Sequence, residues 1–157
     1  MRMLKSALVV GALLLSGMAW AGAPKVTGEI QFINGGLEAY SAVSVHADWG
    51  NQTAGGWFTY SDVNGAYTLD VQCVSIDVAA GTATFVGVVT ESTRTDIVVG
   101  NNIQIWLVDN GKPGQIQKAG GTPDGIQGNV GDCAKLGTAP PGPMLPAIAG
   151  NITVHDK

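Results

Sequence analysis

The sequence has few charged residues and no run of basic ones. Asp, Glu, Lys and Arg make up 13% of the 157 residues, against about 25% in typical soluble domains. The formal net charge at pH 7 is −4. An acidic chain without a basic patch is poorly suited to binding nucleic acid or an anionic membrane surface. We therefore expect neither of these partners.

Catalytic signatures are also missing. Histidine occurs only at positions 46 and 155, and neither G-x-S-x-G nor H-E-x-x-H is present. A hydrolase needs a nucleophile, a base and an orienting acid held together. His46 has Ser44 and Asp48 near it, whereas His155 lies close to the C-terminus, where order is usually poor. We expect no enzymatic activity, no cofactor and no metal, and a hydrolase that uses His46 is the weakest hypothesis.

Two short segments, 62–65 (DVNG) and 109–111 (DNG), contain the oxygen-bearing side chains that calcium prefers. That ion takes six to eight oxygen ligands, and neither segment supplies more than two side chains of this kind. Asp and Asn before Gly also make the hydrogen bonds that turns require. We interpret both segments as turns.

The one long apolar segment is N-terminal. Arg2 and Lys5 precede an apolar stretch over 7–15, and 19–21 reads Ala-Trp-Ala. This order is typical of a secretory signal peptide, and the stretch is shorter than the ~20 residues that span a bilayer. We predict a leader over 1–21, cleaved after Ala21. The remaining 22–157 is expected to be a single β domain, secreted or in the periplasm or cell envelope, without membrane insertion.

Cysteine occurs only at positions 73 and 133. A Cys-x-x-Cys redox motif is absent, and neither cysteine lies at zinc-finger spacing from a histidine. Cysteine pairs in exported proteins usually form disulfides. We therefore predict a structural disulfide between Cys73 and Cys133.

Alternating apolar residues predict β-strands separated by Gly-rich turns, and no amphipathic helix is evident. Short connections favour antiparallel neighbours. The sequence therefore predicts an all-β domain of about eight antiparallel strands in a small barrel or a two-sheet sandwich, with the last strand near the first. The strand-like segments are 26–33, 40–47, 56–60, 66–78, 82–90, 103–108 and 147–155.

The segment 66–78 changes its pattern at Cys73. Before Cys73 the apolar residues Leu69 and Val71 stand at odd-numbered positions, and after it Val74 and Ile76 stand at even-numbered positions, which would face the other side of a regular strand. Such a switch within a β segment indicates a bulge, or a strand that passes from one sheet region to another.

A Gly- and Pro-rich segment over 109–146 shows hardly any apolar alternation. Loops this long in a compact domain are functional or poorly ordered. We predict an extended irregular loop that Cys133 ties to the sheet. Since the last strand follows this loop, that strand could also pair with a neighbouring molecule, so self-association is a further hypothesis.

Aromatic residues are few, and three tryptophans follow the predicted leader: Trp49, Trp57 and Trp106. Such rings pack in β cores and cross-strand pairs. They can also form a platform for a sugar or glycan, and Trp49 and Trp57 flank a Gly-rich turn that could place both at one end of the domain. Core packing is the plainer interpretation, and a ligand platform formed by these tryptophans is the alternative.

Two stretches, DVQCVSIDVAAGTATFVGVVTEST and WLVDNGKPG, resemble a family of uncharacterised secreted bacterial proteins. In that family a strand ending in a cysteine precedes a valine-rich hairpin strand, and a V-x-DNG segment and a later cysteine follow. The corresponding positions here are Cys73, 86–89, 108–111 and Cys133. The resemblance covers roughly 55–133 and implies an extracellular β domain with a Cys73–Cys133 pair. It implies no activity, and Lys112 replaces an acidic residue often found after DNG.

Two hypotheses about function follow. The first is a secreted, disulfide-stapled β domain with a structural or interaction role toward an unknown protein or glycan partner. The second is a small barrel that binds an apolar molecule or a glycan in a pocket or on an aromatic rim. An interior filled with side chains and buried tryptophans would favour the first. A lined cavity of several hundred Å³ would favour the second.

Overall fold

The computed structural model describes residues 22–48, 54–110, 125–137 and 139–156. The predicted leader and Trp49 lie outside these residues. Among the described residues no helix is long and apolar enough to cross a membrane. They form eight strands and one short 3-10 helix: β1 Lys25–Asn34, β2 Leu37–His46, β3 Gly55–Asp62, β4 Gly65–Asp77, β5 Thr82–Ser92, β6 Asn102–Val108, β7 Gly125–Val130, η1 Cys133–Lys135 and β8 Leu145–His155.

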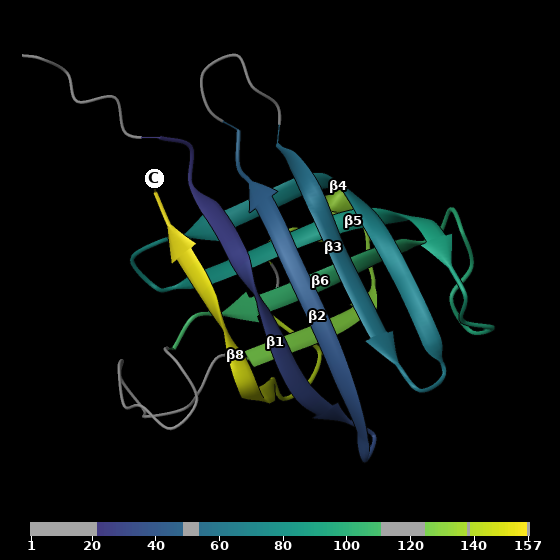
Figure 1. The fold of residues 1–157 in the computed structure, drawn as a ribbon. Helices are drawn as coiled ribbons and strands as arrows, with labels where there is room; N and C mark the ends of the chain where they lie inside the picture. Colours follow the sequence, from purple (N-terminus) through teal and green to yellow (C-terminus); the bar gives the residue numbers. More distant parts are fainter. Residues whose placement is uncertain (1–21, 49–53, 111–124, 138, 157) are drawn as a thin grey trace, which may run out of the picture.

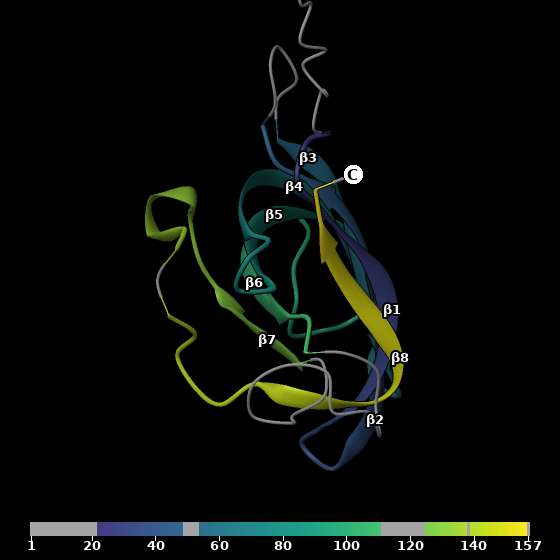
Figure 2. The ribbon, with the colours of Figure 1, turned by 90° about the vertical axis from the view of Figure 1, so that its left-hand side faces the viewer.

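The strands form a closed barrel in chain order, each antiparallel to the next (Figure 1). Of the two architectures predicted, the barrel is therefore the one adopted. The last strand does pair with the first, since β8 joins β1 from Lys25↔His155 to Phe32↔Ala147. Figure 2 shows that β8 bends, so that its first part runs beside the start of β7 and its second part follows β1.

The hairpin turns follow the glycine pattern of the sequence. Gly35 and Gly36 join β1 to β2 with φ values of 60° and 83°, which suit the turn that matches the strand twist. The segment 62–65, interpreted as a turn, forms a hairpin between β3 and β4 around Asn64-Gly65. Its two-residue connection lies one position earlier than the Asn-Gly pair, because Gly65 already begins β4.

The barrel interior consists of alternate residues from the strands. Val26, Ile30 and Phe32 of β1 are buried, as are Ile105 and Leu107 of β6, and these inward faces agree with the predicted alternation. Burying one such side chain contributes about 1.5–3 kcal/mol. The closed wall thus surrounds a continuous apolar core.

The outer face of β4 to β6 is covered by the segment around η1. Cys73 and Cys133 form the predicted disulfide, with an S–S distance of 2.07 Å. Val86 and Gln104 are 1% and 2% exposed, although they alternate with core residues along their strands. The Gln104 Nε2 donates to the Lys135 carbonyl at 3.3 Å. This cover accounts for the burial of Val86 on the outward face of β5.

The pattern switch in β4 corresponds to a bulge. The register with β5 shifts between Val71 and Cys73. Past this shift Val74 and Ile76 still pack against the core. One additional residue thus allows two apolar patterns of opposite parity to serve the same interior.

One part of the predicted irregular loop is a strand. Within 109–146, Gly125–Val130 forms β7 and pairs with β6 from Ile103↔Val130 to Val108↔Gly125. The sequence gives little sign of this strand, because the inward positions hold Ile126, Gly128 and an exposed Val130. The strand conformation of Gly125–Val130 is therefore explained by its pairing with the apolar β6 and not by its own side-chain pattern. Residues 111–124 of the predicted loop lie outside the described residues.

Candidate functional site

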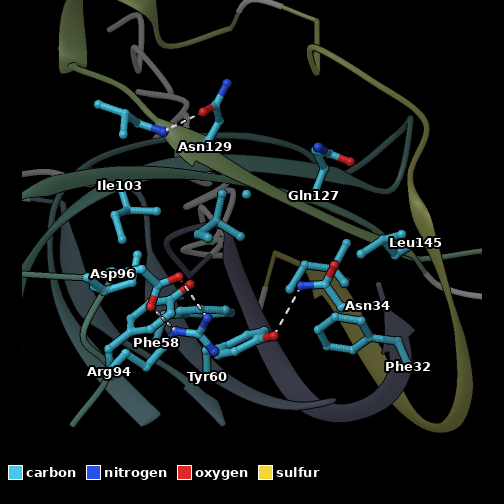
Figure 3. Close-up of a pocket in the computed structure, with 16 residues that line it drawn as sticks. Phe32, Asn34, Phe58, Tyr60, Arg94, Asp96, Ile103, Gln127, Asn129 and Leu145 are labelled. Atoms are coloured by element: carbon cyan, nitrogen blue, oxygen red, sulfur yellow. Dashed lines mark hydrogen bonds and ion pairs between the residues drawn. The ribbon is translucent and has the colours of Figure 1, made fainter. Parts of the chain in front are cut away.

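A pocket of about 310 Å³ opens at the barrel end that carries the β1–β2, β3–β4 and β5–β6 connections (Figure 3). Apolar side chains form most of its wall, and polar side chains from the end of β1 and from the β5–β6 connection complete it. The apolar wall contains Phe32, Phe58, Ile97, Ile103, Ile105 and Leu145, and the polar side chains belong to Asn34, Arg94 and Asp96; Gln127 and Asn129 border the pocket along β7, where they alternate with the inward positions.

The space exists because β7 and β8 diverge. Their ladder holds only Gly125↔Pro146 and Ile126↔Leu145. The next inward position on β7 is Gly128, where a Cβ would lie 3.1 Å from Ile105 Cδ1. With no side chain at this position, the interior remains unfilled between β7 and the opposite wall.

Two tyrosines that face each other across β3 and β4 form the opposite wall. The rings of Tyr60 and Tyr67 stack at 5.2 Å with an interplanar angle of 16°. Burial is the main cause that raises the pKa of both phenols, so both are neutral at physiological pH. Phe32 and Phe58 make tilted contacts with these two rings. The pocket therefore has an aromatic wall into which a flat apolar group can pack.

Arg94 links the rim of the pocket. Its Nη1 donates to Asp62 Oδ2 at 2.6 Å, and Nε and Nη2 donate to the two carboxylate oxygens of Asp96 at 2.9 and 2.8 Å. The guanidinium carbon lies 5.5 Å from the centroid of the Tyr60 ring, within cation–π range. Arg94 thus ties the segment between β5 and β6 to the end of β3.

The electrostatics of the rim follow from these contacts. The hydrogen bonds from Arg94 lower the pKa of Asp96. For Asp62 burial acts to raise the pKa, but hydrogen bonds from Arg94, the Asn64 N–H and Tyr60 outweigh it and lower the pKa overall. Both carboxylates are therefore charged at neutral pH and together more than balance the guanidinium. The rim offers no uncompensated positive charge to an anion.

The polar contacts continue along the pocket wall. The Tyr60 hydroxyl donates to Asp62 Oδ2 at 2.9 Å and accepts from Asn34 Nδ2 at 3.1 Å. Figure 3 shows Asn34 and Arg94 on either side of Tyr60, whereas Gln127 and Asn129 of β7 point away from these three side chains. A bound molecule would thus meet hydrogen-bonding groups around an apolar centre.

The structure does not gather the tryptophans predicted as a platform. Trp57 lies on β3 and is 46% exposed, whereas Trp106 lies on β6 and is 7% exposed. Strands β4 and β5 separate them. Trp106 alternates with the core residues Ile105 and Leu107, so it lies on the covered outer face. Trp49 lies outside the described residues.

The remaining candidate residues lie outside the pocket wall. His46 and His155 both pair with Lys25, from opposite sides of β1, and His155 Nε2 lies 3.5 Å from Thr27 Oγ1. In the segment interpreted as a turn, Asp109 Oδ2 accepts from the Val154 N–H at 3.0 Å. In the parts of the chain that the structure describes, no group of three or more His, Cys, Asp or Glu residues could hold a metal ion.

The sequence analysis did not single out Arg94 and Asp96, because they lie in a polar stretch between two strands that carries no recognisable motif. One signal was available, because Arg94 is the only arginine after the predicted leader. An isolated arginine close to an aspartate and next to a buried strand indicates a specific ion pair. Comparison of the chain with protein-family models, curated proteins and solved structures gave no match.

Proposed function

We propose that this disulfide-stapled β-barrel is an exported binding protein that holds a small, largely apolar, uncharged molecule at its open end. The observation that carries the proposal is the pocket of about 310 Å³ with the stacked Tyr60–Tyr67 pair in its wall. Its volume lies at the lower end of the range of ligand pockets, ~300–1,000 Å³. An apolar lining with a few convergent polar groups is the usual composition of such sites.

The polar groups favour a neutral ligand over an anionic one. Arg94 is the one cationic side chain in the pocket wall among the described residues, and Asp62 and Asp96 already neutralise it. An anion would meet a net negative rim. A neutral ring with one or two hydrogen-bonding substituents would bury its apolar part against Phe58 and the tyrosines.

Titration with the neutral fluorescent dye N-phenyl-1-naphthylamine tests the proposal. We expect saturable binding of one dye per chain, with increased and blue-shifted emission. Gly128→Leu should weaken the dye affinity at least tenfold, because the added side chain projects from the inward face of β7 toward Ile105.

Val63→Ala serves as the matched control, since Val63 lies in the β3–β4 turn and is 77% exposed. Its dye affinity should equal that of the wild type. Circular dichroism and thermal unfolding would confirm that Gly128→Leu is folded. Equal dye binding by wild type and a folded Gly128→Leu protein would contradict the proposal, as would a failure of the wild type to bind any dye.

The alternative is a structural or interaction domain without a small ligand. The observation in its favour is the Cys73–Cys133 bridge, which fixes the η1 segment onto the barrel wall. Such a domain would show no saturable dye binding and would be recovered with a protein or glycan partner from envelope extracts. Self-association through the last strand belongs to this alternative, and it would require β8 to leave its ladder with β1.

Export is part of both proposals. The leader pattern over 1–21 and a disulfide, which persists in oxidising compartments, support it, as does the resemblance to secreted bacterial proteins. Intact-mass measurement of the protein from culture fluid or periplasm should give a chain that begins at Gly22 and lacks two protons at the cysteines. A full-length chain retained in the cytoplasm would contradict export.

A further inference from the structure

The outer face of β1, β2 and β3 carries a second, shallower groove, of about 280 Å³. The strand register aligns its side chains in rows across the sheet. One row consists of Gln31, Tyr40 and Ser61, and the next consists of Glu29, Ala42 and Thr59. These side chains alternate with the barrel core, so they belong to the outer surface and have no part in the pocket described above.

A third row extends this face to an exposed tryptophan. Thr27, Ser44 and Trp57 align beyond the groove. Tyr40 and Trp57 are 49% and 46% exposed. Ser61, which pairs with Tyr40, is four residues from Trp57 along β3, so the two aromatic side chains are separated by about 13 Å along the strands. The side chains between them, Ala42, Ser44 and Thr59, are small.

This face is a hydrogen-bonding surface, with a single carboxylate, between two aromatic rings. Hydroxyl and amide groups dominate the three rows, Glu29 supplies one carboxylate, and none of the nine side chains is basic. An anionic polymer would meet negative charge without a compensating cation. A sugar ring instead presents a face of C–H groups to an aromatic ring and hydroxyl groups to polar side chains.

We infer that this outer face, with Tyr40 and Trp57 at its ends, binds a neutral polysaccharide chain. The aromatic rings contact separate sugar units, and Gln31, Thr59 and Glu29 hydrogen-bond to the hydroxyl groups between them. The groove is open along the sheet, so the ligand is an extended polymer and not a molecule enclosed in a pocket. This site is independent of the ligand proposed for the barrel end.

Affinity electrophoresis of the full chain in native gels tests the inference. The probes are hydroxyethylcellulose, mixed-linkage β-glucan and galactomannan as neutral polymers, with polygalacturonate as the acidic comparator. We expect at least one neutral polymer to retard the wild type and polygalacturonate to have no effect. Tyr40→Ala and Trp57→Ala should each weaken the affinity about tenfold, and the double variant should migrate as if no polymer were present.

Three further variants show whether the aromatic rings of this face are responsible for the retardation. Tyr40→Phe, which keeps the ring, should retain most of the affinity. Gly128→Leu and Val63→Ala should behave as the wild type, because neither position belongs to the three rows. Retardation by polygalacturonate alone, by none of the polymers, or to an equal degree in folded Tyr40→Ala and Trp57→Ala proteins and the wild type would overturn the inference.

Discussion

At the scale of single residues, Arg94 shows how one side chain organises the open end of the barrel. It joins two carboxylates, from the end of β3 and from the β5–β6 connection, and lies over an aromatic ring. Exposed ion pairs contribute little to stability, but Arg94 and Asp62 have side chains that are only 13% and 5% exposed. The Arg94–Asp62 contact is therefore expected to matter more for the rim than the Arg94–Asp96 contact.

Acid should weaken this arrangement. Because the folded-state pKa values of Asp62 and Asp96 lie below the ordinary value of 3.8, their contribution to stability is complete well above pH 4. It is lost as the pH falls through 3.8 and then through the lowered pKa values. Urea unfolding from pH 7 downward should show this loss. Asp62→Asn should reduce the free energy of unfolding at pH 7 by about 1.5–3 kcal/mol and flatten its decrease in acid. If the free energy of unfolding fell equally with pH in the wild type and in Asp62→Asn, Asp62 would not be a source of the acid sensitivity.

Replacing Gly150 should cost stability for two reasons, its positive φ and its close contact with β1, and a second glycine separates the two. Its φ is +83°, and a Cβ would lie 2.1 Å from the Glu29 carbonyl oxygen across the β1–β8 ladder. Gly137 has a similar φ of +87° but open space around it. Gly137→Ala should cost about 1–2 kcal/mol from the backbone alone, and Gly150→Ala clearly more, as measured by urea unfolding. Equal costs would show that the strands can separate slightly without penalty.

At the scale of elements, strands were predictable where their own side chains carry the pattern. β1 and β6 bury alternate apolar residues, and β4 revealed its bulge through Val71 and Val74. β7 was not predictable, since its place in the barrel depends on its neighbour β6 and on a glycine at an inward position. A pocket was one of the hypotheses, but its position and its residues were missed for the same reason: the space arises where β7 and β8 diverge, and its rim depends on a contact between Asp62 and Arg94, which only the closed barrel brings together.

The disulfide is the element-scale feature with the largest predicted effect. It joins residues separated by 60 positions, and the loop-entropy model assigns such a bridge about 4 kcal/mol of stability. The double variant Cys73→Ser with Cys133→Ser should unfold at correspondingly lower urea concentration. Reduced wild type should match the double variant. A loss below about 1 kcal/mol would mean that the contacts of the η1 segment, such as Gln104 to Lys135, hold this part without the bridge.

At the scale of the whole molecule, the last strand closes the barrel with a long ladder on one side and a short ladder on the other. β8 pairs with β1 along most of its length but with β7 at only two positions. Beyond Ile126 the ladder between β7 and β8 stops, and the Val130 N–H donates to the side chain of Asn129 at 2.8 Å. We therefore expect the wall to open most readily at the junction of β7 and β8. This junction also borders the pocket, which makes local opening a route for a ligand to enter.

Hydrogen exchange with mass spectrometry can test this route. Peptides from Gly128 to Val130 should exchange at least tenfold faster than peptides from β1, because their amides open without unfolding the barrel. Saturation with N-phenyl-1-naphthylamine should slow exchange in β7 more than in β1, because the dye covers the part of β7 that has no ladder with β8, whereas the β1 amides are already paired with β2 and β8. Equal protection of β7 and β1 in the free protein would show that the barrel opens only as a unit. The ligand would then have to enter through the end of the barrel, past Arg94, and the Asp62→Asn variant should accelerate dye association.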